Sequence, residues 1–379
     1  MAYKIKLDRN ERIIQLISKG KRIFCLGERE GSNGYNMKIV VLAGGISTER
    51  DVSLSSGKKI YNALKEKGQD VILLDVYLGY EGSIDGIFEQ TIDWVGHIPE
   101  IREKQPDLEQ IRIKRKNASM GFFGPNILTI CQQADIVFMA LHGEDGENGK
   151  VQATFDLFGI KYTGTDYVSA ALAMDKGLTK ELFHCYGIRN PRSSTLKKEF
   201  PHRDTIDFPK VVKVACGGSS VGVHIVNTES EYQKALQEAF QLESDVIVEE
   251  YIEGREFSVG VMEGSALPII EITLKQGFYD YVNKYQAGNA IETCPADLSA
   301  DRTKELKAEA EKIFRILRLK AYARIDFIMS KKDGFFYCLE ANTLPGMTPS
   351  SLFPQEAAAI GLSYPDLCMK IIDISLNKY

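Results

Sequence analysis

Short apolar runs alternate with amphipathic stretches along most of the chain, and this alternation starts at residue 37. The run KIVVLA at 38–43 is typical of a buried strand, and the amphipathic stretch 53–67 predicts a helix soon after it. Apolar runs at 70–76 and 134–141 predict two more buried strands. Strands and helices in this order indicate an open sheet covered by helices, and therefore an α/β fold.

A second unit begins near residue 162, where strands start to come in neighbouring pairs. The elements predicted from residue 150 onward are a helix at 150–159, two helical segments within 162–188, strand–loop–strand units at 208–226 and 246–264, a helix at 303–318, paired strands at 321–329 and 335–343, and a helical C-terminus at 354–376.

Two segments do not follow this alternation of predicted strands and helices. Residues 1–36 are polar and end in the loop-like string GEREGSNGYN, so they are interpreted as an N-terminal extension with one short helix at 9–19. Residues 77–127 form a long connection between two strands, which we interpret as a solvated insertion. A basic patch that binds phosphate is the alternative for that connection, and the extension has no role that its sequence decides.

Composition narrows the class of protein. The formal net charge is −5, which argues against nucleic acid as the main partner. No apolar run approaches the roughly 18–20 residues of a membrane span, and the charged N-terminus does not have the pattern of a signal peptide. The seven cysteines are scattered without CxxC pairs or zinc spacing. We therefore expect a reduced, cytoplasmic protein without a membrane or nucleic-acid partner.

The turn after the first strand has the strand–glycine–helix order of a nucleotide site, with two glycines at 44–45. Glu49, Arg50 and Asp51 stand where a phosphate would need bare backbone, and the carboxylate of Glu49 favours a cationic guest instead. The residues after the glycines do not complete a GxGxxG pattern, which argues against a dinucleotide-dependent oxidoreductase.

The segment 214–223, VACGGSSVGV, is a glycine- and serine-rich loop between two strands. Glycines let backbone N–H groups close over phosphates, although a plain hairpin turn would have a similar sequence. Lys213 directly before the loop favours the phosphate interpretation, and Lys176 on a separate segment is a candidate second cation.

The paired strands near the C-terminus carry a set of candidate metal ligands. Asp326 and Glu340 can lie on one face of the sheet, and Asn342 shares that face because side chains alternate along a strand. Two carboxylates and an amide oxygen suit Mg²⁺, and Arg324 on the same face can stabilise a developing oxyanion. An exposed strand face with solvated charges is the simpler alternative.

Two further loops contain chemically active side chains. HGEDGENGKVQ at 142–152 follows a buried strand, where open α/β sheets bind ligands, and His142 fits a positioning role there better than that of a base. GFYDYVNKYQAG at 277–288 has the aromatic content of a mobile lid.

Taken in their order along the chain, these segments resemble the ATP-grasp ligases, specifically the D-alanine–D-alanine ligase family. The resemblance covers residues 37–379 apart from much of 77–127, and it is carried by GGISTERDVSLSSG, LHGEDGENGKVQ, YTGTDYVSAALAMDK, GGSSVGV, YDYVNKY, RIDF and LEANTLPGMTPSSL. It implies an ATP-grasp fold, whose central and C-terminal lobes clamp ATP between two sheets. The implied domains are an N-terminal extension (1–36), an N-terminal α/β substrate domain (37–164), a central lobe (165–249) and a C-terminal catalytic lobe (250–379).

The same resemblance implies an ATP-dependent, ADP-forming ligase that joins two D-alanines for peptidoglycan precursor synthesis. ATP would phosphorylate the carboxylate of the first D-alanine, and the amine of the second would attack this acyl phosphate. Tyr285 favours the dipeptide, with D-serine or D-lactate as second substrate as the alternative. A nucleotide-binding regulator that has lost catalysis is a further alternative, but the chain retains the charged residues that catalysis would need. Members of the family are commonly dimers, which implies a homodimer.

The residues implied by the resemblance fall into groups by ligand. Those for ATP are Lys176, Lys213, Ser219, Ser220, Glu249, Glu250, Ile252, Glu256 and, on the lid, Lys284. Those for two Mg²⁺ ions, or Mn²⁺ in their place, are Asp326, Glu340 and Asn342. Those for the two D-alanines are Glu49 at the first ammonium, His142 near the first carboxylate, and Ser351 and Leu352 at the second site.

The resemblance also implies a catalytic set. Arg324 and the backbone N–H of Gly346 would form the oxyanion site, and Glu49, Ser219 and Tyr285 would form a hydrogen-bonded link between the N-terminal turn, the phosphate loop and the lid. Two positions depart from the family pattern: Asn148 replaces an aspartate, which would alter the packing of its loop, and Glu250 replaces a lysine, which would weaken ATP binding.

Overall fold

The computed structural model describes residues 15–18, 21–24, 36–96, 98, 106–115, 121–199, 204–218, 222–274 and 290–379. The chain divides into two compact units, Met1–Asn36 and Met37–Tyr379. In the first, β1 (Gln15–Ser18) pairs antiparallel with β2 (Lys21–Phe24). The helix expected at 9–19 is therefore wrong over 15–18, and its other residues lie outside the described part. β-Branched residues on both sides of a glycine in the sequence favour such a pair of strands.

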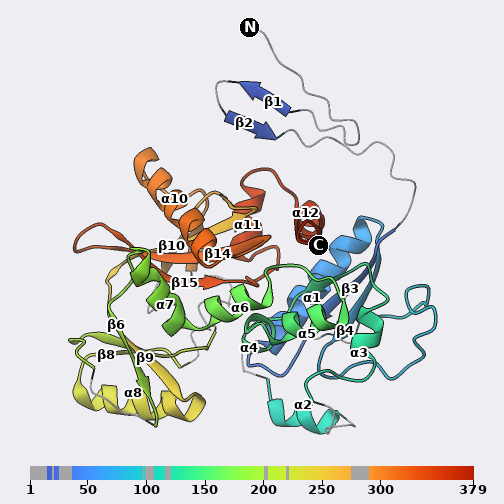
Figure 1. Cartoon of the computed structure of the whole chain (residues 1–379), viewed down its shortest axis with the longest axis horizontal. Coiled ribbons are helices and arrows are strands. Elements are labelled where there is room, and N and C mark those ends of the chain that lie inside the picture. The colour runs from blue at the N-terminus through green and yellow to red at the C-terminus, as the bar shows by residue number, and fades with distance from the viewer. Residues whose placement is uncertain are drawn as a thin grey trace. The chain divides into compact units, whose positions relative to one another are not determined.

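The second unit begins with the parallel sheet that the apolar runs predict. β3 (Lys38–Ala43) lies between β4 (Asp70–Asp75) and β5 (Ile136–Met139). α1 (Arg50–Glu66) packs on β3 and β4. The last helix of the chain, α12 (Tyr364–Leu376), contacts both α1 and β5, so the two ends of this unit lie side by side (Figure 1). One hydrophobic core contains residues from both ends.

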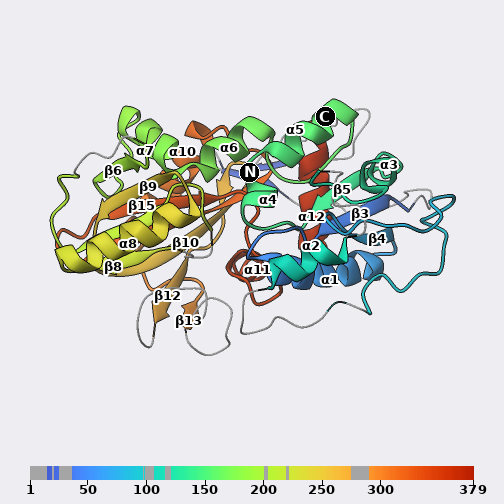
Figure 2. The same cartoon turned by 90° about the horizontal axis from the view of Figure 1, so that it is seen from below.

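A four-stranded antiparallel sheet follows. Its order is β6 (Ser193–Lys197), β9 (Asp245–Glu250), β7 (Lys210–Val214) and β8 (His224–Val226). α8 (Glu229–Leu242) covers one face of this sheet (Figure 2). α6 (Tyr167–Met174) and α7 (Lys176–Cys185) precede the sheet and match the two predicted helical segments.

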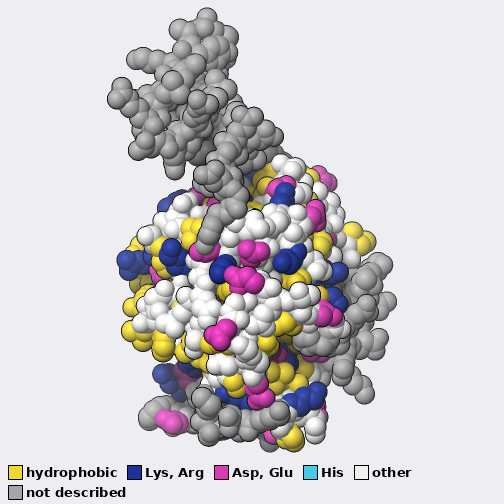
Figure 3. All heavy atoms as spheres, turned by 90° about the vertical axis from the view of Figure 1, so that its right-hand side faces the viewer, with side chains coloured by type: hydrophobic (Ala, Val, Ile, Leu, Met, Phe, Trp, Pro, Cys, Tyr) yellow, Lys and Arg dark blue, Asp and Glu magenta, His cyan; other side chains and the backbone are white. Residues whose placement is uncertain are grey.

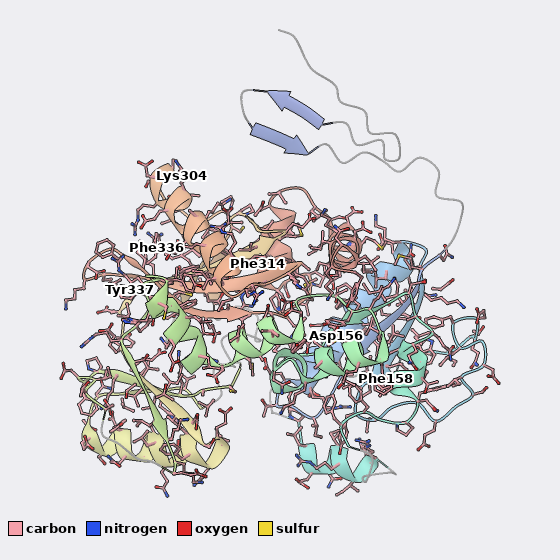
Figure 4. The ribbon with its side chains drawn as sticks, viewed as in Figure 1. Asp156, Phe158, Lys304, Phe314, Phe336 and Tyr337 are labelled. Carbon is pink, nitrogen blue, oxygen red and sulfur yellow. The ribbon has the colours of Figure 1, made fainter. Side chains whose placement is uncertain are left out.

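The largest sheet is also antiparallel. Its order is β13 (Ala290–Thr293), β12 (Ile270–Leu274), β10 (Gly254–Met262), β14 (Tyr322–Ser330) and β15 (Phe336–Asn342), and β11 (Ser265–Ala266) pairs with β10. α10 (Ala300–Ile316) covers one face, where Phe314 and Phe336 belong to the same core (Figure 4). Because side chains alternate along a strand, Arg324 and Asp326 point away from that core.

The remaining helices lie in the connections: α2 (Leu108–Lys114), α3 (Ile127–Cys131), α4 (Glu144–Glu147), α5 (Lys150–Phe158) and α11 (Leu352–Ala358). α2 is solvated as expected, but the interpretation of 77–127 as wholly solvated is wrong, because Ile87 and Trp94 are buried in the first core. The C-terminal helical stretch divides into α11 and α12, with Gly361 between them at a positive φ of 81°.

The distribution of charged and hydrophobic side chains over the described surface agrees with the mixed amino-acid composition. Acidic, basic and hydrophobic side chains are interspersed over the described part of the face in Figure 3. None of the helices in the described ranges combines the length and the apolar character needed to cross a membrane.

Candidate active site

A cleft of about 540 Å³ opens between the four-stranded sheet and the largest sheet. Strands β7 and β9 supply one wall, and β10, β12, β14 and β15 supply the other. The residues expected to bind ATP that fall in the described ranges all line this cleft: Lys176, Lys213, Glu249, Glu250, Ile252 and Glu256. Ser219, Ser220, Lys284 and Tyr285 lie outside the described residues.

One buried carboxylate organises the cations on the inner wall of the cleft. The Nζ atoms of Lys213 and Lys180 lie 2.9 and 2.8 Å from the same Oε1 of Glu249. Burial alone would raise the pKa of Glu249, but the two ammonium groups hold that pKa below its usual value. Burial lowers the pKa of Lys180 against the opposing effect of Glu249. The wall thus keeps Lys213 in place while leaving it at the cleft surface.

Lys176 lines the same cleft. Its Nζ donates to the backbone oxygen of Gly217 at 2.6 Å and lies 3.5 Å from Oε2 of Glu340. Asp175, the N-cap of α7, accepts from the backbone N–H of Leu178 and so fixes the start of the helix that begins with Lys176. Lys176 therefore connects the glycine-rich loop to the candidate metal ligands.

The candidate metal ligands lie opposite one another on β14 and β15. Asp326 pairs with Glu340 in the strand register, and Arg324 pairs with Asn342. Asp326 accepts hydrogen bonds from Arg324 Nη2 at 2.7 Å and Asn342 Nδ2 at 2.9 Å. No cluster of three or more His, Cys, Asp and Glu side chains with metal-binding geometry occurs among the described residues. Asp326 and Glu340 line the cleft, and Asn342 lines the smaller cavity beside it. Two carboxylates and one amide nevertheless form the oxygen-rich set that suits Mg²⁺.

A second, smaller cavity of about 150 Å³ adjoins the cleft. The two share Gly218 and Glu340 in their walls. The smaller cavity brings together the remaining expected residues, which come from three separate parts of the chain: Glu49, His142, Arg324, Asn342, Gly346, Ser351 and Leu352. A ligand in this cavity would therefore meet the end of a nucleotide in the cleft.

Glu49 is buried at the start of α1, where it occupies the N-cap position. A side-chain carbon on either Gly143 or Gly218 would come within 2.7 Å of its Oε2 atom. Gly143 also has a φ of 72°, which favours glycine, whereas a side chain at Gly218 would require the carboxylate to shift. Glu49 thus lies between the loop after β5 and the glycine-rich loop.

His142 is also buried, and both of its ring nitrogens have partners. Nδ1 lies 3.0 Å from the backbone oxygen of Leu344, which can only accept, so Nδ1 carries the proton. Nε2 lies 3.2 Å from Oγ of Ser56. Burial lowers the pKa of His142, so the neutral ring accepts from Ser56. The ring is held in one orientation at the wall of the smaller cavity.

Comparisons with known proteins agree with this arrangement. The family model described as D-ala D-ala ligase N-terminus matches residues 38–165, and the model described as D-ala D-ala ligase C-terminus matches 177–373. The chain belongs to the D-alanine–D-alanine ligase family.

Individual relatives of this family member extend over nearly its whole length. D-alanine–D-alanine ligase of Lacticaseibacillus casei is 45% identical over 349 residues, which cover 90% of this chain and 97% of the relative. The enzyme of the same name from Pediococcus pentosaceus is 45% identical over 89% of this chain and 97% of its own. A crystal structure of D-alanine–D-alanine ligase from Bacillus anthracis complexed with ATP is 28% identical and superposes with a TM-score of 0.70 over 90% of this chain and 98% of its own. The expected ATP-grasp fold is thereby confirmed.

The sequence of this ligase did not single out two side chains that matter to its site. Lys180 lies one helical turn after Lys176, and this spacing of four residues is a signal that both could face the same wall. Glu147 lies in the quoted loop after β5, and only the folded structure shows that it lines the smaller cavity.

The two departures from the family pattern lie in different settings. The carboxylate of Glu250 accepts from both the backbone N–H and Nε of Arg192, at 2.9 and 3.0 Å. Asn148 Oδ1 accepts from the backbone N–H of Lys150 at 3.0 Å, at the start of α5. Each side chain therefore has a local structural partner.

Proposed function

We propose that this protein is an ATP-dependent ligase that joins two D-alanines into D-alanyl-D-alanine for peptidoglycan precursor synthesis. Family membership supports this activity, and the observation that carries it is that the two cavities adjoin, with Gly218 and Glu340 in the walls of both. In this reaction the γ-phosphoryl group passes to the carboxylate of the first D-alanine. The amine of the second then attacks the acyl carbon, and inorganic phosphate leaves.

The lysines that line the large cleft support a nucleotide site there. Lys213 and Lys176 line the cleft and carry charge suited to phosphates, and both are oriented by carboxylates. The set Asp326, Glu340 and Asn342 would hold Mg²⁺, or Mn²⁺ in its place, at the inner end of the cleft. A bound divalent ion would neutralise charge on the phosphates during transfer.

The residues that line the smaller cavity support a site for the two amino acids there. Glu49 would bind the ammonium of the first D-alanine, since its buried carboxylate is attractive to a cation. Arg324 and the N–H of Gly346 would face the developing oxyanion, and Ser351 with Leu352 would receive the second D-alanine. Ser351 begins α11, and its Oγ accepts from the backbone N–H of Thr348 at 3.1 Å, which fixes the turn that carries it.

The assay for this proposal combines the full-length protein with ATP, Mg²⁺ and D-alanine, and measures phosphate and dipeptide. We expect both products, in equal amounts, only when D-alanine is present. Phosphate release that does not depend on D-alanine would contradict the proposal.

The second substrate is tested by competition. Equal amounts of D-alanine, D-serine and D-lactate are offered together, to the full-length protein and to a chain that starts at Met37. We expect D-alanyl-D-alanine as the main product, and a preference for D-lactate at neutral pH would contradict it. We further propose that the enzyme acts in the cytoplasm and that it is a homodimer. Sedimentation of the active protein measures its oligomeric state directly.

A further inference from the structure

The peptide group of Leu344 is held on both of its polar sides by one loop of the N-terminal lobe. Its N–H donates to Oε1 of Glu147 at 3.2 Å, and its carbonyl accepts from Nδ1 of His142 at 3.0 Å. The partners are 197 and 202 residues away in the sequence. We call this pair of contacts the Leu344 clamp.

The N-terminal half of the clamp is itself fixed in place. The second carboxylate oxygen of Glu147 accepts from the backbone N–H of Gly143 at 3.0 Å, so the side chain bridges two amides from different parts of the chain. The neighbouring turn is tied down by Gln152, whose buried side chain donates to the carbonyl of Gly146 at 2.6 Å. His142 is oriented by Ser56 on α1.

Leu344, the other half of the clamp, lies close in sequence to two residues with proposed roles in the active site. Leu344 is two residues after Asn342, a candidate metal ligand, and two residues before Gly346, whose N–H faces the proposed oxyanion. Its side chain is buried in the core shared with β3 and β5. A displacement of the Leu344 peptide would therefore move both neighbours relative to the substrates.

We propose that Glu147 is a positioning residue, which bridges the amides of Gly143 and Leu344 and, together with His142, sets the position of the segment 342–346 in the active site. This inference rests on the proposed ligase function. Reaction rates depend steeply on such placement, since an error of about 1 Å can cost on the order of 100-fold.

Three variants distinguish the effect of the length of the Glu147 side chain from the effect of its charge. Glu147→Gln keeps the length and one acceptor, Glu147→Asp keeps the charge but is too short to reach both amides, and Glu147→Ala removes both. We expect kcat to fall in the order wild type, Glu147→Gln, Glu147→Asp, with Glu147→Ala similar to Glu147→Asp and about 10- to 100-fold below wild type. KM for ATP should stay within about twofold, because the nucleotide cleft does not include Glu147.

Glu231→Gln is the matched control. Glu231 also accepts from a backbone N–H four residues earlier, that of Asn227 at 2.7 Å, but it lies on exposed α8 and lines neither cavity. We expect wild-type kinetics from this variant. If Glu147→Asp keeps wild-type turnover while Glu147→Gln loses it, charge rather than bridging matters, and the proposal is overturned.

Hydrogen exchange without substrates tests the clamp independently of the activity. Removal of the acceptor in Glu147→Ala should speed exchange in a peptide covering 343–347 at least tenfold, while exchange in β3 stays unchanged. Unchanged exchange at 343–347 would overturn the clamp. If the wild type forms no dipeptide although the clamp behaves as expected, the proposed function fails and the structural assignment survives.

Discussion

Two glutamates in the walls of adjoining cavities show opposite behaviour. Glu249, in the nucleotide cleft, has its pKa held below the usual value by two ammonium groups, although burial acts in the other direction. Glu147, in the smaller cavity, has its pKa raised to about 7 by burial and by the nearby Glu49 carboxylate. A glutamate side chain is therefore a fixed anion in the wall of the cleft, as Glu249, and an ionisable group near neutral pH in the wall of the smaller cavity, as Glu147.

The comparison teaches that neighbours rather than depth decide the charge of a carboxylate. Glu249 shares one oxygen between Lys180 and Lys213. Glu147 has two backbone amides as hydrogen-bond donors, and these lower its pKa less than desolvation raises it.

The largest expected effect comes from the residue that lines both cavities. Glu340→Gln removes a candidate metal-binding charge and the partner of Lys176, so we expect the turnover number to fall about 1,000-fold. The unfolding midpoint should hardly move, because Glu340 is partly exposed. Steady-state kinetics measure this loss, and near-normal turnover would contradict the metal assignment.

A smaller effect, on stability, is expected from Glu249→Gln. The substitution leaves two buried ammonium groups without their shared carboxylate and should cost about 3 kcal/mol in free energy of unfolding near pH 7. Because the folded pKa of Glu249 is lowered from 4.5, this difference should be complete above pH 5 and shrink as the pH falls further. Denaturant titrations at several pH values measure it.

The adjacent position supplies the control for that measurement. Glu250 pairs with Arg192, whose side chain is 66% exposed, so Glu250→Gln should change stability by no more than about 0.5 kcal/mol. Equal losses in the two variants would contradict the role of the shared carboxylate.

A further effect on stability is expected from Glu147→Gln, and its pH dependence has the opposite sign to that of Glu249→Gln. Between pH 4.5 and 7 the folded protein keeps a proton that the unfolded chain has released, so wild-type stability falls as the pH rises through this range. The variant lacks this titration, and its stability relative to wild type should improve by about 2 kcal/mol from pH 4.5 to pH 8. A constant difference across that range would show that Glu147 is ionised throughout.

The periodic spacing of apolar residues predicted most of the helices and strands, because the residues on the buried face of each element recur every two to four positions along the chain. The β14–β15 pair is the clearest case, since alternation alone places Arg324, Asp326 and Asn342 on one face. Contacts over long sequence separations were not predictable in this way. The bridge from Glu147 to Leu344 joins two lobes, and the shared carboxylate of Glu249 joins separate segments of the central lobe. Both exist only in the folded structure.

Two expectations were only partly confirmed, and the differences have local physical causes. The stretch 354–376 keeps its helical pattern through Gly361, where glycine permits the positive φ that ends one helix before the next begins. The insertion 77–127 has a polar average, but a few large apolar side chains in it suffice to fill the first core.

Because α12 packs against α1 and β5, the order of synthesis limits when the core of the N-terminal lobe can be completed. The first strands of the second unit, β3 to β5, share their core with Leu367, Ile371 and Ile372, which are among the last residues to be made. The N-terminal lobe therefore cannot complete its interior until the chain is released, although chains generally fold from the N-terminus as they emerge. The part of its core that α12 completes stays open for most of translation, so the loss of a short C-terminal stretch should harm the first lobe as well as the last.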